Sequence, residues 1–326
     1  MEKPYVYITR KLPQELVEPI GQFADFRMWE KEEEPVPRDV LLEEAKKVDA
    51  LFTMLSDPVD EELIEAAPRL KVVANLAVGY DNIDVDAATK RGIAVCHTPE
   101  ILSDTTADLT FSLLLMVARR LPEAVELVKR GEWKSWSPFF MAGADVHHKT
   151  IGIVGMGSIG EAVARRARGF DMKILYHNRN RKPAAEKELG AVYCSFDELI
   201  QKSDFVVCMT PLTEETKGMF NKEVFKKMKK TAYFINAARG GVVVEKDLVE
   251  ALENGEIAGC GLDVFEEEPI SADHPLLKFK QVVALPHIGS ASVETRTNMV
   301  RRCIRNIELV LKGKKPLSIV NDEIFE

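Results

Sequence analysis

Short apolar runs alternate with amphipathic segments through the first third of the chain. The runs are rich in Val, Ile, Leu and Ala, which favours buried strands, and the segments between them repeat with a helical period. The predicted strands are 6–9, 26–29, 50–54, 71–74 and 94–96. The predicted helices are 13–19, 38–47, 60–66 and 86–91. Strands and helices that alternate at this spacing predict a parallel sheet with helices on both faces.

The same alternation starts again near Thr150. Its predicted strands are 151–154, 173–176, 205–209, 232–236, 259–264 and 282–285. Its predicted helices are 161–168, 184–188, 222–228 and 246–252. A long helix at 103–119, continued helically by 121–130, leads into this region, and a last amphipathic helix is predicted at 293–311 with a short polar tail behind it. The pattern therefore predicts the α/β class, with two doubly wound parallel-sheet domains.

Composition narrows the function classes. The chain has 326 residues, too many for one typical core, and a net charge of −8 that argues against a nucleic-acid partner. We find no run of about 18 apolar residues, and hence no candidate membrane span. The five cysteines have no metal-binding spacing, and the N-terminus has no signal-peptide pattern, so we expect reduced thiols in a cytoplasmic protein.

A glycine turn follows the first strand of the second domain. The stretch T-I-G-I-V-G-M-G-S-I-G, residues 150–160, places Gly155, Gly157 and Gly160 at the G-x-G-x-x-G spacing. The first glycine allows the tight turn, the second lets a pyrophosphate approach the backbone, and the third lets the helix pack against the strand. The helix N-terminus adds unpaired N–H groups and a positive dipole end. Because strand, turn and helix occur in this order, we interpret the stretch as a dinucleotide site.

The residues after the next strand indicate which dinucleotide binds. NAD sites usually have an Asp or Glu about 20 residues after the glycines, which binds the ribose 2′-OH. No acid occurs from Met172 to Ala185, and Asn178, Arg179 and Asn180 follow the strand instead. An arginine can pair with a 2′-phosphate, although arginines here could also simply face solvent. We predict a preference for NADP(H), with NAD(H) as a second cofactor.

Polar residues cluster where the later strands end. Ligands of open parallel sheets bind beyond the carboxyl ends of the strands. The residues found there are Thr210 and Pro211, 236–240, Asp263, 266–268 and His287. Arg239 could grip a carboxylate and polarise a carbonyl, and His287 is the best acid among six histidines. A neighbouring Glu would orient the imidazole; spacing alone does not separate Glu266, Glu267 and Glu268, and we choose Glu268 because Pro269 makes it the most rigid.

The motif set has no serine elbow, no H-E-x-x-H and no Cys/His metal cluster, so a metal site is not predicted. A nicotinamide cofactor, an arginine, a histidine and a glutamate are the components of a hydride-transfer site.

Together these motifs resemble those of the D-isomer-specific 2-hydroxyacid dehydrogenases. The resemblance rests on the glycine turn, N-L-A-V-G-Y-D-N-I-D, N-A-A-R-G-G, G-L-D-V-F-E-E-E-P and L-P-H-I-G-S-A-S, and it covers nearly the whole chain. Within the family the chain is most similar to glyoxylate/hydroxypyruvate reductases and bacterial 2-ketogluconate reductases. The resemblance implies a Rossmann nucleotide-binding domain, 100–286, inserted into a flavodoxin-like substrate domain, 1–99 plus 287–326. It also implies a homodimer and an NADPH-preferring reductase of small 2-oxo acids.

The resemblance assigns roles to residues of this chain. Arg239 would hold the substrate, His287 would be the acid and Glu268 its partner. Other substrate contacts are predicted at Met54, Val78 and Gly79. The predicted cofactor residues are Gly155, Gly157, Ser158, Ile159, Gly160, Asn178, Arg179, Asn180, Thr210, Pro211, Thr216, Ala237, Ala238, Asp263, His287 and Gly289.

An aromatic loop leaves undecided which 2-oxo acid is the substrate. The irregular segment 131–148 holds Trp133, Trp136, Phe139 and Phe140, which either fold against the body or form a subunit contact. In some hydroxypyruvate reductases a tryptophan of this loop reaches the partner's active site, and Phe140 stands there in this chain. A 2-ketogluconate reductase is therefore an alternative. A corepressor-like protein that senses NAD(P) is an alternative from another class.

Overall fold

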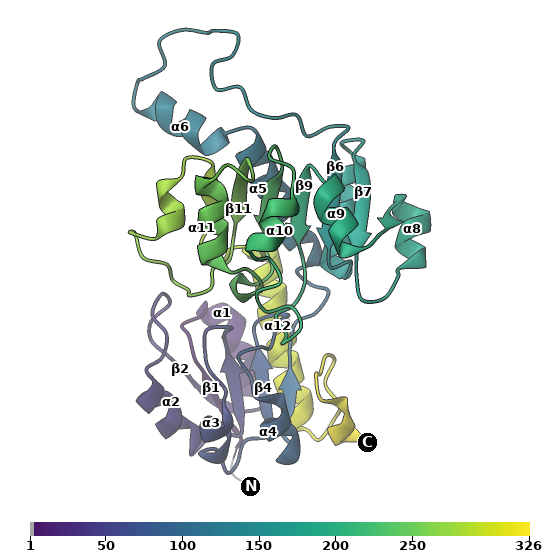
Figure 1. Cartoon of the computed structure of the whole chain (residues 1–326). Helices are drawn as coiled ribbons and strands as arrows, with labels where there is room; N and C mark the ends of the chain where they lie inside the picture. Colours follow the sequence, from purple (N-terminus) through teal and green to yellow (C-terminus); the bar gives the residue numbers. More distant parts are fainter. Residues whose placement is uncertain (1–2) are drawn as a thin grey trace. The chain divides into compact units, whose positions relative to one another are not determined.

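The computed structural model describes residues 3–326, which form two compact units (Figure 1). One unit combines the segment up to Leu102 with Ala291–Glu326, and the other is Ser103–Ser290. The predicted domain 100–286 begins and ends a few residues before the second unit. We call the first the discontinuous unit and the second the continuous unit, because the first is made of two separate segments of the chain.

The discontinuous unit is built on a five-stranded parallel sheet of order β2-β1-β3-β4-β5. Its strands are β1 Tyr5–Ile8, β2 Asp25–Met28, β3 Ala50–Thr53, β4 Val72–Asn75 and β5 Ala94–Cys96. Its helices are α1 Gln14–Val17, α2 Arg38–Ala45, α3 Glu61–Glu65, α4 Val85–Lys90 and α12 Val293–Leu311. Short 3-10 turns lie at Glu18–Gln22 and Asp322–Phe325. Side chains at the starts of three helices accept from their first turns: Asp60, Asp84 and Ser292.

The C-terminal tail is an integral part of this unit. Within the short polar tail, Val320 donates its N–H to the carbonyl of Val95, 2.8 Å away. The Asn321 side chain is buried and accepts from the N–H of Val95 at 2.9 Å. The tail therefore satisfies the free edge of β5, which an exposed parallel edge strand would otherwise leave open.

The continuous unit is built on a seven-stranded parallel sheet of order β12-β11-β10-β9-β6-β7-β8. Its strands are β6 Thr150–Val154, β7 Lys173–His177, β8 Val192–Tyr193, β9 Phe205–Cys208, β10 Tyr233–Asn236, β11 Gly259–Leu262 and β12 Val282–Ala284. Its helices are α5 Ser103–Ala118, α6 Leu121–Lys129, α7 Ser158–Arg168, α8 Pro183–Leu189, α9 Phe196–Lys202, α10 Lys222–Lys227 and α11 Glu245–Glu253. Short 3-10 turns lie at Gly240–Val242 and Pro275–Lys278. The predicted fold class is confirmed: both sheets are parallel and doubly wound.

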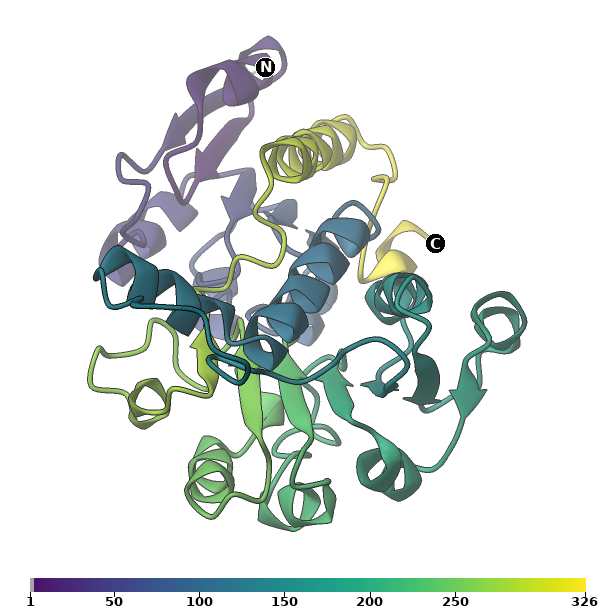
Figure 2. The same ribbon diagram turned by 90° about the horizontal axis from the view of Figure 1, so that it is seen from above.

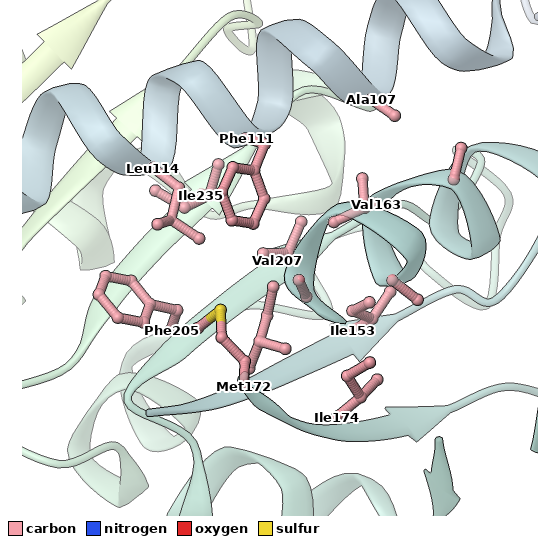
Figure 3. Packing of buried hydrophobic residues seen from close by; sticks show 14 of the residues in the cluster. Ala107, Phe111, Leu114, Ile153, Val163, Met172, Ile174, Phe205, Val207 and Ile235 are labelled. Atoms are coloured by element: carbon pink, nitrogen blue, oxygen red, sulfur yellow. The ribbon is translucent and has the colours of Figure 1, made fainter. Parts of the chain in front are cut away.

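Helices cover both faces of the seven-stranded sheet. In Figure 2 the blue helix α5 lies on one face, and the green helices α10 and α11 lie on the other. Figure 3 shows the first interface, where Phe111 and Leu114 of α5 pack against Phe205, Val207 and Ile235 of the strands. Alternate strand residues point into the second core, as the two-residue period of a strand requires. Gly261 lets α5 approach closely, since a Cβ there would lie 2.7 Å from the Leu113 side chain.

Three local features differ from the predicted elements. The helix 103–119 does not continue into 121–130, because Arg120 has φ +54° and a new helix starts at Leu121, with Pro122 in its first turn. The prediction missed β8, which has only two residues, and α9. The signal for α9 was present in S-F-D-E, since Ser195 caps the helix by accepting from the N–H of Glu198 at 3.2 Å.

The five cysteines are all buried free thiols. No helix in residues 3–326 has the length and apolar character that a membrane crossing requires.

Candidate active site

The glycine turn joins β6 to α7, and each of its glycines has a different environment. Gly155 has φ +101°, and a Cβ there would lie 2.6 Å from the carbonyl of Met209. A Cβ on Gly160 would lie 2.2 Å from the carbonyl oxygen of Gly155. Gly157, the N-cap of α7, has no neighbouring atom within 4 Å of such a Cβ. The first and third glycines are therefore needed for packing, while the second leaves open space at the backbone.

This open space lies at the start of α7. Ser158, Ile159 and Gly160 form the first turn of the helix, whose N–H groups precede any partner four residues back. The positive end of the helix dipole points the same way. The turn therefore has the open backbone and the helix N-terminus that a pyrophosphate site requires.

Two exposed arginines follow β7, and they differ in their partners. Asn178 closes a turn by donating to the carbonyl of Asn180 at 2.9 Å. Arg179 is 85% exposed, with its Nη1 4.0 Å from a carboxylate oxygen of Glu215. Arg181, in contrast, donates to Glu186 at 2.7 Å and stacks over a tyrosine ring. Arg179 is therefore the less constrained of the two arginines.

The loop after β9 is braced by a predicted cofactor residue. The Thr216 hydroxyl donates to the carbonyl of Pro211 at 2.6 Å and accepts from the N–H of Thr213 at 2.8 Å. Thr210 lies at the start of this loop, with its hydroxyl 3.6 Å from the Cys208 sulfur. The hydroxyl of Thr216 is thus committed to the shape of the loop.

The turn that carries Arg239 is set by a buried asparagine at the end of β10. Asn236 donates to the carbonyl of Arg239 at 3.0 Å and accepts from the N–H of Ala238 at 3.1 Å. Ala237 and Ala238 form the body of this turn, and the Arg239 guanidinium donates to the carbonyl of Ala238 at 2.9 Å. Sequence reasoning missed this role of Asn236.

Asp263 follows β11 and is only 1% exposed. Its Oδ1 accepts from the N–H of Ile288 at 2.8 Å. Its Oδ2 is buried and has no hydrogen-bond partner within residues 3–326. Gly289 lies beside it, since a Cβ there would be 3.2 Å from Oδ2. Burial raises the pKa of the Asp263 carboxyl above its ordinary value, although the nearby N–H groups of Ile288 and Gly289 and the charge of His287 oppose this.

An acceptor with no partner in a buried position fits an amide donor of a ligand. The carboxamide of a nicotinamide ring supplies such a donor, so the residues here fit the predicted cofactor.

His287 and Glu268 form a direct pair. The His287 Nδ1 lies 2.6 Å from Glu268 Oε2, and the other oxygen of Glu268 accepts from the N–H of Phe265 at 2.9 Å. Burial alone would raise the pKa of Glu268, but the hydrogen bond from His287 and the nearby positive charges outweigh it and hold the pKa below its ordinary value. The three candidate glutamates are thereby separated, because Glu268 is the one that contacts His287.

The pair leaves the other ring nitrogen of His287 available, because Nδ1 is occupied. Arg239 lies close enough for its charge to lower the pKa of Glu268. The continuous unit therefore brings together Arg239, Asp263, Glu268 and His287, which come from three successive strand ends.

The other predicted substrate residues lie in the discontinuous unit. Beyond β4, the carbonyl of Val78 is 2.9 Å from His97 Nδ1, and the carbonyl of Gly79 accepts from Asn75 at 3.1 Å. Within residues 3–326, neither Val78 nor Gly79 has a partner for its N–H. Met54 follows β3, and its carbonyl accepts from Asn82 at 3.2 Å. The loop thus holds its carbonyls inward and leaves two N–H groups for an anion.

Comparison with known proteins identifies the family. The model of the D-isomer specific 2-hydroxyacid dehydrogenase NAD-binding domain matches residues 111–289. A glyoxylate reductase of Thermococcus kodakarensis is 52% identical over 328 residues, which cover 99% of this chain and 98% of that protein. The chain belongs to the D-isomer-specific 2-hydroxyacid dehydrogenases.

Other relatives of this dehydrogenase agree. A glyoxylate reductase of Pyrococcus furiosus is 49% identical over 328 residues, with 99% of this chain and 97% of that protein covered. The structure of an NADPH-dependent glyoxylate/hydroxypyruvate reductase from Sinorhizobium meliloti with NADP and malonate has a TM-score of 0.86, at 32% identity. The match covers 100% of this chain and 99% of that one. The predicted family and the prediction of an NAD(P)-dependent oxidoreductase are confirmed.

Proposed function

We propose that this dehydrogenase is an NADPH-preferring reductase of small 2-oxo acids to D-2-hydroxy acids, of the glyoxylate/hydroxypyruvate type. The observation that carries the proposal is the Glu268–His287 pair, held at 2.6 Å beside Arg239 and the buried Asp263. The relatives named glyoxylate reductase, at 52% and 49% identity, support the substrate class.

Each of these residues has a separate role in the proposed reaction. Bound NADPH supplies the hydride for the carbonyl carbon of the substrate. The ionised Glu268 holds Nδ1 of His287, so that Nε2 carries the proton that the carbonyl oxygen receives. Arg239 binds the substrate carboxylate and stabilises negative charge as it develops on that oxygen. Val78 and Gly79 offer backbone N–H groups to the carboxylate.

Replacing His287 tests the acid role. In His287→Ala we expect kcat to fall by about 10²- to 10⁴-fold, which is the usual contribution of a positioned acid. NADPH binding should be retained, because the glycine turn is untouched. A near-normal kcat would contradict the assignment. A wild-type protein that binds NADPH but turns over no 2-oxo acid would favour the corepressor-like alternative.

The cofactor preference rests on Arg179. We expect a higher kcat/KM with NADPH than with NADH, and we expect Arg179→Ala to reduce that ratio. Arg181→Ala is the matched control, because Arg181 is bound by Glu186. A wild-type enzyme that prefers NADH would refute this part of the proposal.

A substrate panel decides between the small and the longer acids. Initial rates with glyoxylate, hydroxypyruvate, 2-ketogluconate and pyruvate should rank glyoxylate and hydroxypyruvate first. The highest kcat/KM with 2-ketogluconate would favour the sugar-acid alternative.

Exposed apolar side chains on α6 and the following loop support a homodimer. Trp136 is 78% exposed and Phe139 is 88% exposed, and five more large apolar side chains lie near them in sequence. These are Leu121, Val125, Val128, Trp133 and Phe140. A run of this kind on the surface is typical of an interface. We expect sedimentation to show a dimer that Phe139→Ser weakens, whereas Leu317→Ser, at an exposed leucine outside this run, leaves it intact. A monomeric wild type would refute the assignment.

A further inference from the structure

A second Glu–His pair lies next to the proposed catalytic pair. Glu245 is the first residue of α11, and His274 precedes the 3-10 turn Pro275–Lys278. Nε2 of His274 lies 3.1 Å from Oε2 of Glu245, and the two side chains are only 19% and 14% exposed.

The other oxygen of Glu245 holds the loop that carries Glu268. Glu245 Oε1 accepts from the backbone N–H of Glu266 at 2.7 Å. The preceding N–H, that of Phe265, donates to Glu268 itself at 2.9 Å. Two consecutive N–H groups of this loop are thus bound by carboxylates, one from α11 and one from the glutamate that contacts His287.

The same helix follows the turn that carries Arg239. Gly240 packs directly against the Glu268 loop, since a Cβ on Gly240 would lie 1.8 Å from the carbonyl of Phe265. Glu245 therefore connects two loops that bear different functional residues. The Arg239 turn leads into α11, and the side chain of Glu245 reaches back to the Glu268 loop.

The bonds involved are strong enough to matter for geometry. Hydrogen bonds to a charged group are stronger than bonds between neutral groups, and an interior of low dielectric strengthens them further. Without the Glu245 carboxylate, the N–H of Glu266 and the ring of His274 would both lose their partner. The loop could then shift, and a displacement of about 1 Å near reacting groups can cost about 10²-fold in rate.

We propose that Glu245 and His274 are positioning residues, which fix Glu268 relative to Arg239 and so orient His287. They do not touch the substrate in this scheme; they act through Glu268. The inference rests on the proposed function, because it assumes that Glu268 and His287 take part in the reaction.

Steady-state kinetics of the full-length enzyme with glyoxylate and NADPH test the inference. We expect Glu245→Ala and His274→Ala to lower kcat by about 10-fold or more while the Kd for NADPH stays unchanged. His274→Gln should recover much of the loss, because its amide can donate to Glu245 from the position of Nε2. Glu253→Ala, at the exposed end of α11, is the matched control and should behave as wild type.

A double-mutant cycle separates positioning from a general effect on folding. If Glu245 acts through Glu268, then Glu245→Ala costs kcat much less in a Glu268→Gln background than in the wild type. An equal cost in both backgrounds would overturn the inference, as would a His274→Gln variant no better than His274→Ala. If Glu245→Ala does not fold, the two His274 variants in the same backgrounds decide the outcome. A fully active Glu268→Gln variant would instead contradict the proposed function.

Discussion

Replacing Asp263 with asparagine should weaken cofactor binding without destabilising the fold, because it changes a single buried atom. Asp263 Oδ1 accepts from Ile288 at 2.8 Å, and Asn can keep this bond with its own oxygen. The change falls on Oδ2, which is buried without a partner within residues 3–326. In Asp263→Asn that acceptor becomes an N–H donor of almost the same size, so packing changes little.

The expected loss of affinity follows from one hydrogen bond. A carboxamide that donates to the ionised Asp263 gains about 1.5–3 kcal/mol, the range for hydrogen bonds to charged groups. In the variant two donors face each other and this bond is lost. Since about 1.4 kcal/mol is a factor of ten, the Kd for NADPH should rise by roughly 10- to 150-fold.

The stability of the cofactor-free protein, unlike its affinity for NADPH, should not fall. Burial raises the pKa of Asp263 above the ordinary value of 3.8, so the folded protein holds the proton more tightly than the unfolded chain. Ionisation of Asp263 therefore costs folding free energy at pH 7, and this cost disappears as the pH falls through the folded-state pKa towards 3.8. The neutral asparagine avoids the cost, so the free variant should melt at the same temperature or higher at pH 7.

Fluorescence titration with NADPH and thermal melting of the free protein measure both quantities. Asp273→Asn, on an exposed residue, serves as the control for a lost negative charge. A variant that binds NADPH as tightly as the wild type would refute the assignment of Oδ2 to the cofactor. A variant that is clearly less stable at pH 7 would refute the argument from burial.

Four further substitutions have distinct expected outcomes. Gly157→Ala should abolish tight NADPH binding and leave the melting temperature nearly unchanged. Gly160→Ala should lower both the affinity for NADPH and the melting temperature, because of these two positions only Gly160 would place its Cβ against backbone, at 2.2 Å. Equal melting temperatures of the two variants would contradict this. Glu268→Gln should be less stable than wild type at neutral pH, because the folded-state pKa of Glu268 lies below its ordinary value of 4.5. In urea unfolding, the difference in stability between the two proteins should vanish as the pH falls from 4.5 through that folded-state pKa. Arg239→Lys should raise KM for glyoxylate and lower kcat together, because a lysine loses the bidentate grip; a change in KM alone would indicate binding without charge stabilisation.

Local sequence patterns were sufficient to predict those features whose constraints act between residues close in sequence. The glycine spacing at Gly155, Gly157 and Gly160 predicts a β6–α7 turn because the constraints act within a few residues. The alternation of apolar strands and helices predicts parallel sheets for the same reason. Elements with a weak local signal were missed, as the two-residue strand β8 shows, because tertiary pairing with β7 creates them.

The sequence by itself determined the fold class, the dinucleotide turn and the strand ends at which Arg239, Asp263 and His287 lie. The tertiary structure decided which side chains meet. It selected Glu268 from three adjacent glutamates and joined Glu245 to His274 across 29 positions. Among residues 3–326 it left Oδ2 of Asp263 without a hydrogen-bond partner. Periodicity determines which residues are buried and at which end of a strand they lie. The direction of a side chain in a loop depends instead on contacts with residues far along the chain, and only the folded chain brings those residues together.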